Sequence, residues 1–200
     1  MSQPSPNYFT RPVNLNENET SPIPAENWTI RPLASTDRAA VLRLNAENRP
    51  ALAAVEAVEL DQLLAYDGHH LVAVDPMGEV VGFLLSFPRE SRYDDSEINE
   101  LRRRVSESFY YICQVAIAST HRGRGIGRAF YDALAGVARA RGARLLCCDV
   151  NLAPPNPTSL AFHDRLGFDR IGTGTASNGF SIAFLTMCCE LADRSKGVES

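Results

Sequence analysis

Residues 121–128 have the composition and spacing of a phosphate-binding loop. They read His-Arg-Gly-Arg-Gly-Ile-Gly-Arg and lie between an apolar run at 110–118 and a helical pattern that begins near Ile126. Glycines let the backbone approach a ligand closely, and the first N–H groups of a helix have no partner inside the helix. A strand that enters a helix through such a turn therefore presents free donors to an anion. A glycine-rich turn that binds no ligand remains the alternative.

Three known phosphate-loop patterns can be compared with this segment. A P-loop needs Lys-Ser or Lys-Thr after its last glycine, and neither follows here. A dinucleotide fingerprint needs a glycine where Arg128 stands, although Gly123 and Gly125 fit. The third pattern, Arg/Gln-x-x-Gly-x-Gly/Ala after a strand, is matched in full by Arg122, Gly125 and Gly127. In this respect the chain resembles the GNAT acetyltransferase superfamily, whose members bind the pyrophosphate of acetyl-CoA with such a loop.

A second motif covers residues 151–168. Asn156 suits a helix cap, Pro157 the first helical turn and Gly167 a helix stop, so a purely structural interpretation explains these three residues. GNAT members also carry Asn-x-x-Ala/Ser, then Phe-Tyr, then Gly-Phe at this spacing. The matching residues here are Asn156, Ser159, Phe162, Gly167 and Phe168. The form Pro-Pro-Asn-Pro at 154–157, followed by Phe-His at 162–163, looks closest to a little-characterised subgroup of bacterial and fungal GNAT proteins.

The resemblance implies a set of coenzyme-binding residues. Asn156 would contact the pantetheine arm, and the helix after it would flank the coenzyme. A backbone N–H on the strand before the loop, within 114–117, would donate to the thioester carbonyl as charge develops on its oxygen. The residues so implied are Val115, Ala116, Ile117, Arg122, Gly123, Arg124, Gly125, Ile126, Gly127, Arg128, Asn151, Asn156, Ser159 and Phe162.

The chain departs from the family pattern at His163. The family often has a tyrosine there, as the acid that protonates the departing thiolate of coenzyme A. A histidine with an ordinary pKa of about 6.5 can do the same. The alternative is a helix histidine that only packs against the coenzyme.

A base is also needed, because an amine attacks only when it is neutral and a free ammonium has a pKa of about 10. The candidates are Asp149, Glu47, Glu97 and Glu100. Asp149 lies in an apolar strand, where a carboxylate must either face a cleft or have partners such as the loop at 151–156. Glu47 ends the first helix, a place that lines the acceptor site in the family. The alternative is that Glu47 is a solvated acid at the helix end. Gln114, on the central strand, is expected to orient the substrate.

Composition limits the other possibilities. The net charge of −4 offers no basic field for nucleic acid, and Arg102–Arg104 suits a solvated helix face. No apolar stretch is long enough to span a membrane, and no secretory signal is evident at the N-terminus. The five cysteines lack the spacing of a zinc site, so no metal is expected. A reducing compartment, the cytoplasm, is therefore the expected location.

The predicted strands and helices indicate one domain at 28–190, with a mobile arm at 1–27 and a tail at 191–200. Predicted strands cover 28–33, 70–74, 79–87, 108–118, 143–150, 168–175 and 179–190. Predicted helices start near Thr36 and cover about 51–65, 125–141 and 156–166, and a short helix at 96–104 lies in a flexible polar cover at 88–107. This order is an α/β (α+β) fold that resembles the GNAT type: a mixed, mostly antiparallel sheet of about seven strands with about four helices.

The expected function is that of an N-acetyltransferase, which moves an acetyl group from acetyl-CoA to a primary amine by direct attack. Two alternatives remain: an acyl-CoA-binding GNAT-fold module without turnover, and an RNA-binding protein that uses the Arg-Gly loop. The acceptor is expected to be a small-molecule amine or a peptide N-terminus. The mixed charges at 88–107 suit a zwitterion or a peptide terminus, and residues 177–179 are expected to complete that site. The apolar strand 182–189 could join a partner in a homodimer.

Overall fold

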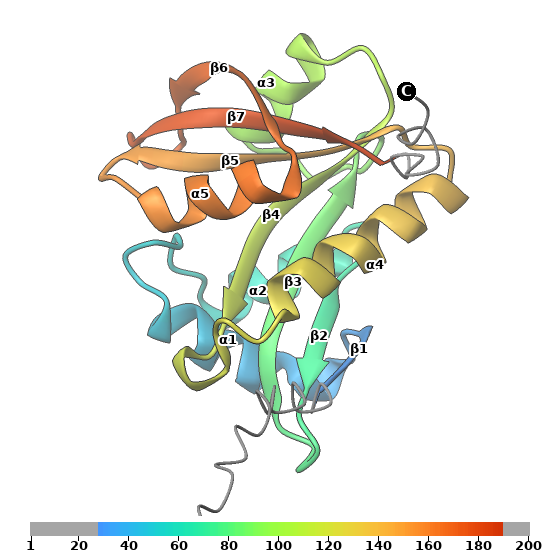
Figure 1. The fold of residues 1–200 in the computed structure, drawn as a ribbon, viewed down its shortest axis with the longest axis vertical. Helices are drawn as coiled ribbons and strands as arrows, with labels where there is room; N and C mark the ends of the chain where they lie inside the picture. Colours follow the sequence, from blue (N-terminus) through green and yellow to red (C-terminus); the bar gives the residue numbers. More distant parts are fainter. Residues whose placement is uncertain (1–27, 190–200) are drawn as a thin grey trace, which may run out of the picture.

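A computed structural model describes residues 28–189, and a seven-stranded sheet lies at its centre (Figure 1). The strands are β1 (Thr29–Pro32), β2 (Leu71–Val74), β3 (Val80–Pro88), β4 (Phe109–Ile117), β5 (Leu145–Ala153), β6 (Asp169–Thr175) and β7 (Ser181–Cys188). Their order in the sheet is β1-β2-β3-β4-β5-β7-β6, and every neighbouring pair is antiparallel except β4 and β5. The predicted mixed sheet is confirmed. The predicted arm at 1–27 and tail at 191–200 lie outside the described residues.

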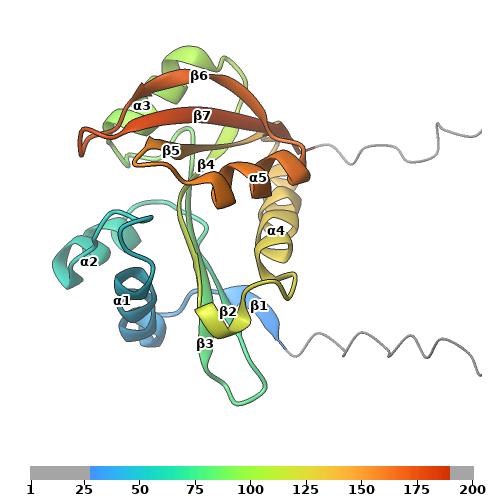
Figure 2. The ribbon, with the colours of Figure 1, turned by 60° about the vertical axis from the view of Figure 1, so that its left-hand side comes forward.

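Five α-helices surround this sheet within the described residues. They are α1 (Arg38–Glu47), α2 (Ala57–Ala65), α3 (Ser96–Arg104), α4 (Ile126–Ala140) and α5 (Pro157–Leu166). Helices α1 and α2 cover one face of the sheet, and α4 and α5 lie on the other (Figure 2). The helix predicted at about 51–65 begins only at Ala57, because the chain turns through residues 48–52 and Glu56 then occupies the N-cap position of α2.

The core follows from the pattern of apolar residues. Strand β3 is buried over nearly its whole length, as expected of a central strand covered on both faces. Helix α4 buries Ile126, Phe130, Leu134 and Ala138, which recur every four residues and form one face. The segment 88–107, predicted as a flexible cover, is instead a packed element: Ile98 and Leu101 of α3 are both fully buried.

The sheet opens between its two parallel strands. Only four residue pairs join β4 to β5, from Phe109 with Leu145 to Ile112 with Cys148. Cys113 then forms a bulge, because Leu85 of β3 pairs with Gln114 and the next residue of β3 pairs with Ile112. Beyond this point β4 continues beside β3, whereas β5 continues beside β7 (Figure 1). A bulge bends the strand that carries it, and the two strands diverge.

The cysteines differ in exposure, and all five are free thiols. Cys147, Cys148 and Cys189 are buried, Cys113 is half-buried, and Cys188, at the end of β7, is exposed. Among the described residues, no helix has the length and apolar character needed to cross a bilayer.

Candidate active site

The predicted phosphate loop forms an open turn at the start of α4. Gly123 and Gly125 have φ angles of +74° and +86°, a region in which a side chain is strained, and Gly125 is the N-cap of the helix. The first backbone hydrogen bond of the helix runs from Ala129 N to Gly125 O. The helix therefore makes no use of the N–H groups of Ile126, Gly127 and Arg128, which can donate to an anion.

Side chains from other elements hold this loop. The indole Nε1 of Trp28 donates to the carbonyl of Arg124 at 3.2 Å. The guanidinium of Arg122 donates to the carbonyl of Ile117 at 3.3 Å and to Oδ1 of Asn48 at 2.7 Å. These contacts tie the loop to β4 and to the end of α1, so the loop is positioned before any ligand binds.

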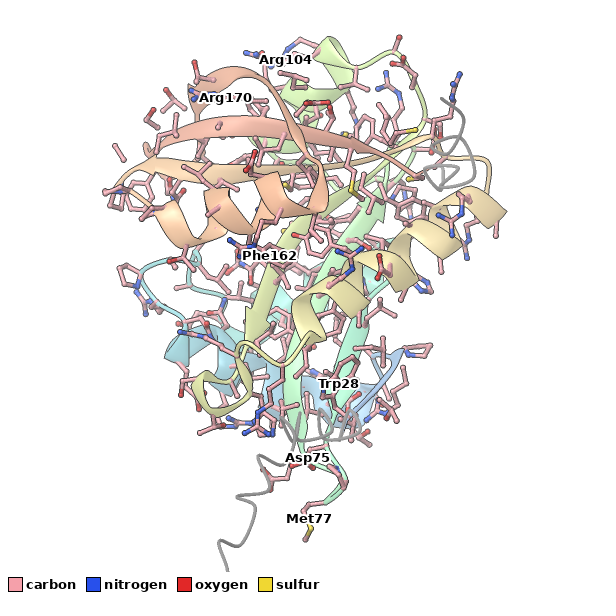
Figure 3. All side chains as sticks on the ribbon, in the orientation of Figure 1. Trp28, Asp75, Met77, Arg104, Phe162 and Arg170 are labelled. Carbon is pink, nitrogen blue, oxygen red and sulfur yellow. The ribbon has the colours of Figure 1, made fainter. Side chains whose placement is uncertain are left out.

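Gly127 brings α4 and α5 together. A Cβ atom at this position would lie 3.1 Å from the ring of Phe162, a contact so tight that the ring would have to shift slightly. Figure 3 shows Phe162 on the side of α5 that faces α4. The sequence-predicted residues Gly127 and Phe162 therefore meet directly.

The predicted carbonyl-binding stretch lies on the open edge of β4. Val115, Ala116 and Ile117 pair with β3 but lie beyond the last residue that pairs with β5. The N–H groups of this stretch that point away from β3 therefore have no strand partner among the described residues. Such groups can donate to a carbonyl oxygen.

At the start of α5, the structural interpretation of the second motif holds. Asn156 Oδ1 accepts a hydrogen bond from the N–H of Ser159 at 3.2 Å, which caps the helix. The predicted contact of Asn156 with pantetheine stays a prediction. Asn151 of β5 donates from Nδ2 to the carbonyl of Ala51 at 3.4 Å, so it links β5 to the segment between α1 and α2.

His163 lies in the core, at 3% exposure. Its Nδ1 is 2.8 Å from the carbonyl of Ser159, which can only accept, so Nδ1 carries a proton and donates. Its Nε2, 2.7 Å from the Tyr131 hydroxyl, then accepts from it. Burial lowers the pKa of the imidazole, and the rings of Tyr131, Phe162 and Phe168 contact it edge-on at centroid distances of 5.0–5.4 Å. The geometry supports the packing interpretation over the acid.

Asp149 has the surroundings of a base. One oxygen of its carboxyl group accepts a hydrogen bond from the Tyr111 hydroxyl at 2.7 Å. Burial raises the pKa of Asp149 to about 7, with smaller contributions from the nearby charges of Glu97 and Asp95. A carboxyl group with this pKa can accept and release a proton at neutral pH.

Helix α3 and the β6–β7 turn meet through Glu97, and that these two segments line the acceptor site stays a prediction. Glu97 accepts hydrogen bonds from the backbone N–H and the hydroxyl of Ser177, at 2.9 and 3.0 Å. Asp95 caps α3 through the N–H of Ile98 at 2.8 Å and also accepts from the Tyr93 hydroxyl. Both acids are close enough to Asp149 for their charges to raise its pKa.

The other two candidate bases are held in surface ion pairs. Glu47 is exposed and lies 2.9 Å from the guanidinium of Arg43. Glu100 pairs with Arg103 and Arg104 on α3, and these partners lower its pKa. Within residues 28–189, no hydrogen bond or ion pair joins either acid to Asp149.

Sequence reasoning missed three polar contacts. Gln114, predicted to orient the substrate, accepts from Asn45 Nδ2 at 2.9 Å and donates to the carbonyl of Ala53 at 3.3 Å, so its amide holds the segment between α1 and α2. The Tyr111–Asp149 pair was also missed. The parallel pairing of β4 with β5 could have indicated this pair. Tyr111 pairs with Cys147, and Asp149, two residues further along β5, lies on the same face of the sheet as Cys147.

Two further observations concern the rest of the described surface. Residues 28–189 contain no group of three or more His, Cys, Asp and Glu side chains that could hold a metal ion. A hollow of about 400 Å³ between α1, α2 and the start of β2 is lined in part by Arg38, Asp61 and His70, and it includes neither the loop nor Asp149.

The comparisons with known proteins agree with this geometry. A model of the acetyltransferase (GNAT) family matches residues 38–168. The ribosomal-protein-S18-alanine N-acetyltransferase of Escherichia coli is 14% identical, over 86% of this chain and 99% of its own, with a TM-score of 0.62. NAA60 of Arabidopsis thaliana in complex with acetyl-CoA is 17% identical, over 80% of this chain and 98% of its own, with a TM-score of 0.63. The phosphinothricin acetyltransferase of Sinorhizobium meliloti in complex with acetyl-CoA is 19% identical, over 81% of this chain and 88% of its own, with a TM-score of 0.61. The sequence has no significant match among curated proteins.

Proposed function

The chain belongs to the acetyltransferase (GNAT) family and is an acyltransferase. On that premise, we propose that it transfers the acetyl group of acetyl-CoA to a primary amine, with Asp149 as the base. The observation that carries the proposal is the carboxyl group of Asp149. Its pKa is about 7, it accepts from Tyr111, and it lies on β5 next to the point where β4 and β5 part.

The residues present fit acetyl-CoA in two respects. The open turn at Gly123 and Gly125 lets backbone approach a pyrophosphate, and the free N–H groups at the start of α4 would hold it. The unpaired edge of β4 from Val115 to Ile117 would bind the thioester carbonyl. When bound, acetyl-CoA supplies the activated acetyl group.

The protein's own part in the reaction is to prepare the amine. Asp149 removes a proton from the bound ammonium, which makes the nitrogen nucleophilic. Tyr111 holds the carboxyl group in place and favours its ionised form. His163 is assigned to packing, because it is neutral and both of its nitrogens are engaged.

The acceptor class is left open by the fold. Neighbouring structures are named for a ribosomal-protein alanine and for phosphinothricin, so both a peptide N-terminus and a small amine are compatible with it. Membership of the subgroup with Pro-Pro-Asn-Pro at 154–157, a cytoplasmic location and a homodimer stay predictions.

A two-part experiment tests the function. Calorimetric titration would measure acetyl-CoA binding, and release of free thiol would be followed over a panel of amines with mass detection of the product. We expect binding in the absence of amine and thiol release that depends on the amine. Coenzyme binding with no acetylated product across the panel would favour a binding module without turnover. No binding at all would overturn the proposal.

A further inference from the structure

The hydroxyl of Tyr110 is buried and has no hydrogen-bond partner among residues 28–189. Tyr110 lies near the start of β4, and only 1% of its surface is exposed. A buried hydroxyl without a hydrogen bond costs free energy, and buried polar groups in native proteins nearly always have a partner. This hydroxyl therefore has an unused capacity to bind a ligand.

A hollow of about 190 Å³ lies beside this side chain. Its polar lining residues are Asp67, Glu90, Ser108, Tyr110 and Arg141. They come from four parts of the chain: the segment after α2, the segment after β3, the start of β4 and the end of α4. Burial raises the pKa of the Tyr110 hydroxyl, and the charges of the arginine and of the two acids act on it as well. The hydroxyl oxygen therefore lies at the charged wall of the hollow.

The charged side chains of the hollow are not paired with one another. Asp67, Glu90 and Arg141 are all exposed, and within residues 28–189 no ion pair joins Arg141 to either acid. The guanidinium of Arg141 lies close enough to the Tyr110 hydroxyl to lower its pKa, but the two groups do not meet in a hydrogen bond of normal geometry. The hollow therefore offers one cation beside a hydroxyl donor, together with two anions.

We propose that this hollow binds a small α-amino acid in its zwitterionic form. Arg141 and the Tyr110 hydroxyl donate to the carboxylate, and Asp67 and Glu90 accept from the ammonium group. The volume of the hollow corresponds to about six water molecules. That space suits an amino acid whose side chain has one or two non-hydrogen atoms. A ligand with a single charge would leave either the arginine or the acids without a partner.

The hollow lies away from the proposed coenzyme site. Gly125 and Arg141 cap opposite ends of α4, which has 15 residues (Figure 1) and is therefore about 22 Å long. An amino acid at the Arg141 end does not compete with a pyrophosphate at the Gly125 end. The inference is thus independent of the proposed function, and either can fail without the other.

Three molecules of nearly the same shape test the ligand class. L-alanine carries both charges, L-alaninamide only the ammonium and propanoate only the carboxylate. Each would be titrated into the isotope-labelled full chain without coenzyme, and the backbone amide signals would be followed by NMR. We expect alanine to bind at least ~10-fold more tightly than either analogue, the scale of one lost charge-assisted hydrogen bond, and to shift the signals of Ser108, Tyr110 and Arg141.

Two results of these titrations would overturn the inference. If alanine at tens of millimolar shifts no signal, the hollow holds only solvent. If the shifts are confined to the start of α4 and to the residues around Asp149, alanine binds as an acceptor and not in the hollow.

Matched variants assign the binding to the proposed residues. Tyr110→Phe removes a hydroxyl without a partner, so its thermal midpoint should stay unchanged or rise, whereas its affinity for alanine should fall about 10-fold. Arg141→Gln should weaken alanine binding by at least ~10-fold. Arg165→Gln, which replaces an exposed arginine on α5, should leave the affinity unchanged. Full alanine affinity in both Tyr110→Phe and Arg141→Gln would also overturn the inference.

Discussion

Asp149 and His163 show how the surroundings of a side chain decide its chemistry. The pKa of Asp149 is raised to about 7 by burial, Glu97 and Asp95, and the Tyr111 hydroxyl opposes this rise. The pKa of His163 is lowered by burial, and both of its nitrogens are engaged. At neutral pH the carboxyl group can exchange a proton, whereas the imidazole stays neutral.

The first prediction concerns the pH dependence of kcat. At saturating amine, kcat should rise with pH through about 7 as Asp149 ionises. Asp149→Asn should abolish this rise and lower kcat by at least ~10²-fold, the lower end of general base catalysis. Tyr111→Phe should move the rise to higher pH, because Tyr111 favours the ionised carboxylate. If Asp149→Asn keeps its rate and Glu47→Gln loses it, the base is Glu47.

The second prediction is that His163 stabilises the fold. His163→Ala removes buried ring contacts and leaves the Tyr131 hydroxyl without its partner, at a cost of about 2–4 kcal/mol in the free energy of unfolding. Chemical denaturation would measure this cost. Adding Tyr131→Phe should recover part of it, because the orphaned hydroxyl is removed.

Activity measurements separate this role from acid catalysis. Well below the melting temperature, kcat of His163→Ala should fall by less than ~10-fold, which is under the range of general acid catalysis. A loss of ~10² or more in kcat, with unchanged coenzyme affinity, would instead assign His163 as the acid.

At the scale of elements, the start of α4 combines a local signal with non-local support. The glycine spacing predicted the turn, and the structure adds the left-handed φ angles of Gly123 and Gly125. The contacts from Trp28 and Arg122 could not be predicted, because Trp28 is 96 residues away from the Arg124 carbonyl that it binds. A valine at Gly125 would strain the backbone as well as crowd a ligand, so it is a poor probe of the site.

The third prediction therefore uses a matched pair of glycines. Gly125 and Gly78 have φ angles of +86° and +84°, and Gly78 lies in the β2–β3 turn with open space around it. Gly125→Ala and Gly78→Ala should each cost about 1 kcal/mol of stability. Only Gly125→Ala should weaken acetyl-CoA binding in a calorimetric titration. Equal affinities in the two variants would place the pyrophosphate elsewhere.

Features of the fold that depend on residues close in the sequence could be predicted, whereas contacts between residues far apart in the sequence could not. All seven strands were predicted within a few residues, because alternating apolar residues and Gly or Pro breaks are local signals. The hydrogen bond between Glu97 and Ser177 was not predicted, because the two residues are 80 positions apart and their contact depends on tertiary packing. The same holds for His163, whose partner Tyr131 is 32 residues away on another helix.

At the scale of the whole described domain, the sheet has two parts, and the proposed site draws on both. Only four residue pairs join β4 to β5, and they divide the sheet. Strands β1–β4 and the loop before α4 lie on one side of these pairs, and β5, α5, β6 and β7 lie on the other. The phosphate loop therefore comes from the first part and Asp149 from the second. In the proposed function, the relative placement of the two parts would bring Asp149 to the coenzyme.

The fourth prediction is that the first 25 residues are dispensable. Their polar, unpatterned composition is the basis, and a deletion of residues 1–25 keeps Trp28. Coenzyme affinity and the thermal midpoint should stay nearly unchanged. Trp28→Phe in the full chain should instead weaken coenzyme binding about threefold, the worth of one modest hydrogen bond. A large loss on deletion would show that the segment contributes to the domain.

The uneven burial of the cysteines makes the protein suitable for labelling at one position. A thiol reacts as its thiolate, and burial raises the pKa of Cys113, Cys147 and Cys148, and that of Cys189 to about 11. A maleimide should therefore modify the exposed Cys188 first, and peptide mass mapping would check this. A fluorophore or spin label at the end of β7 could then report on movement of the β5–β7 part of the sheet without any cysteine being replaced.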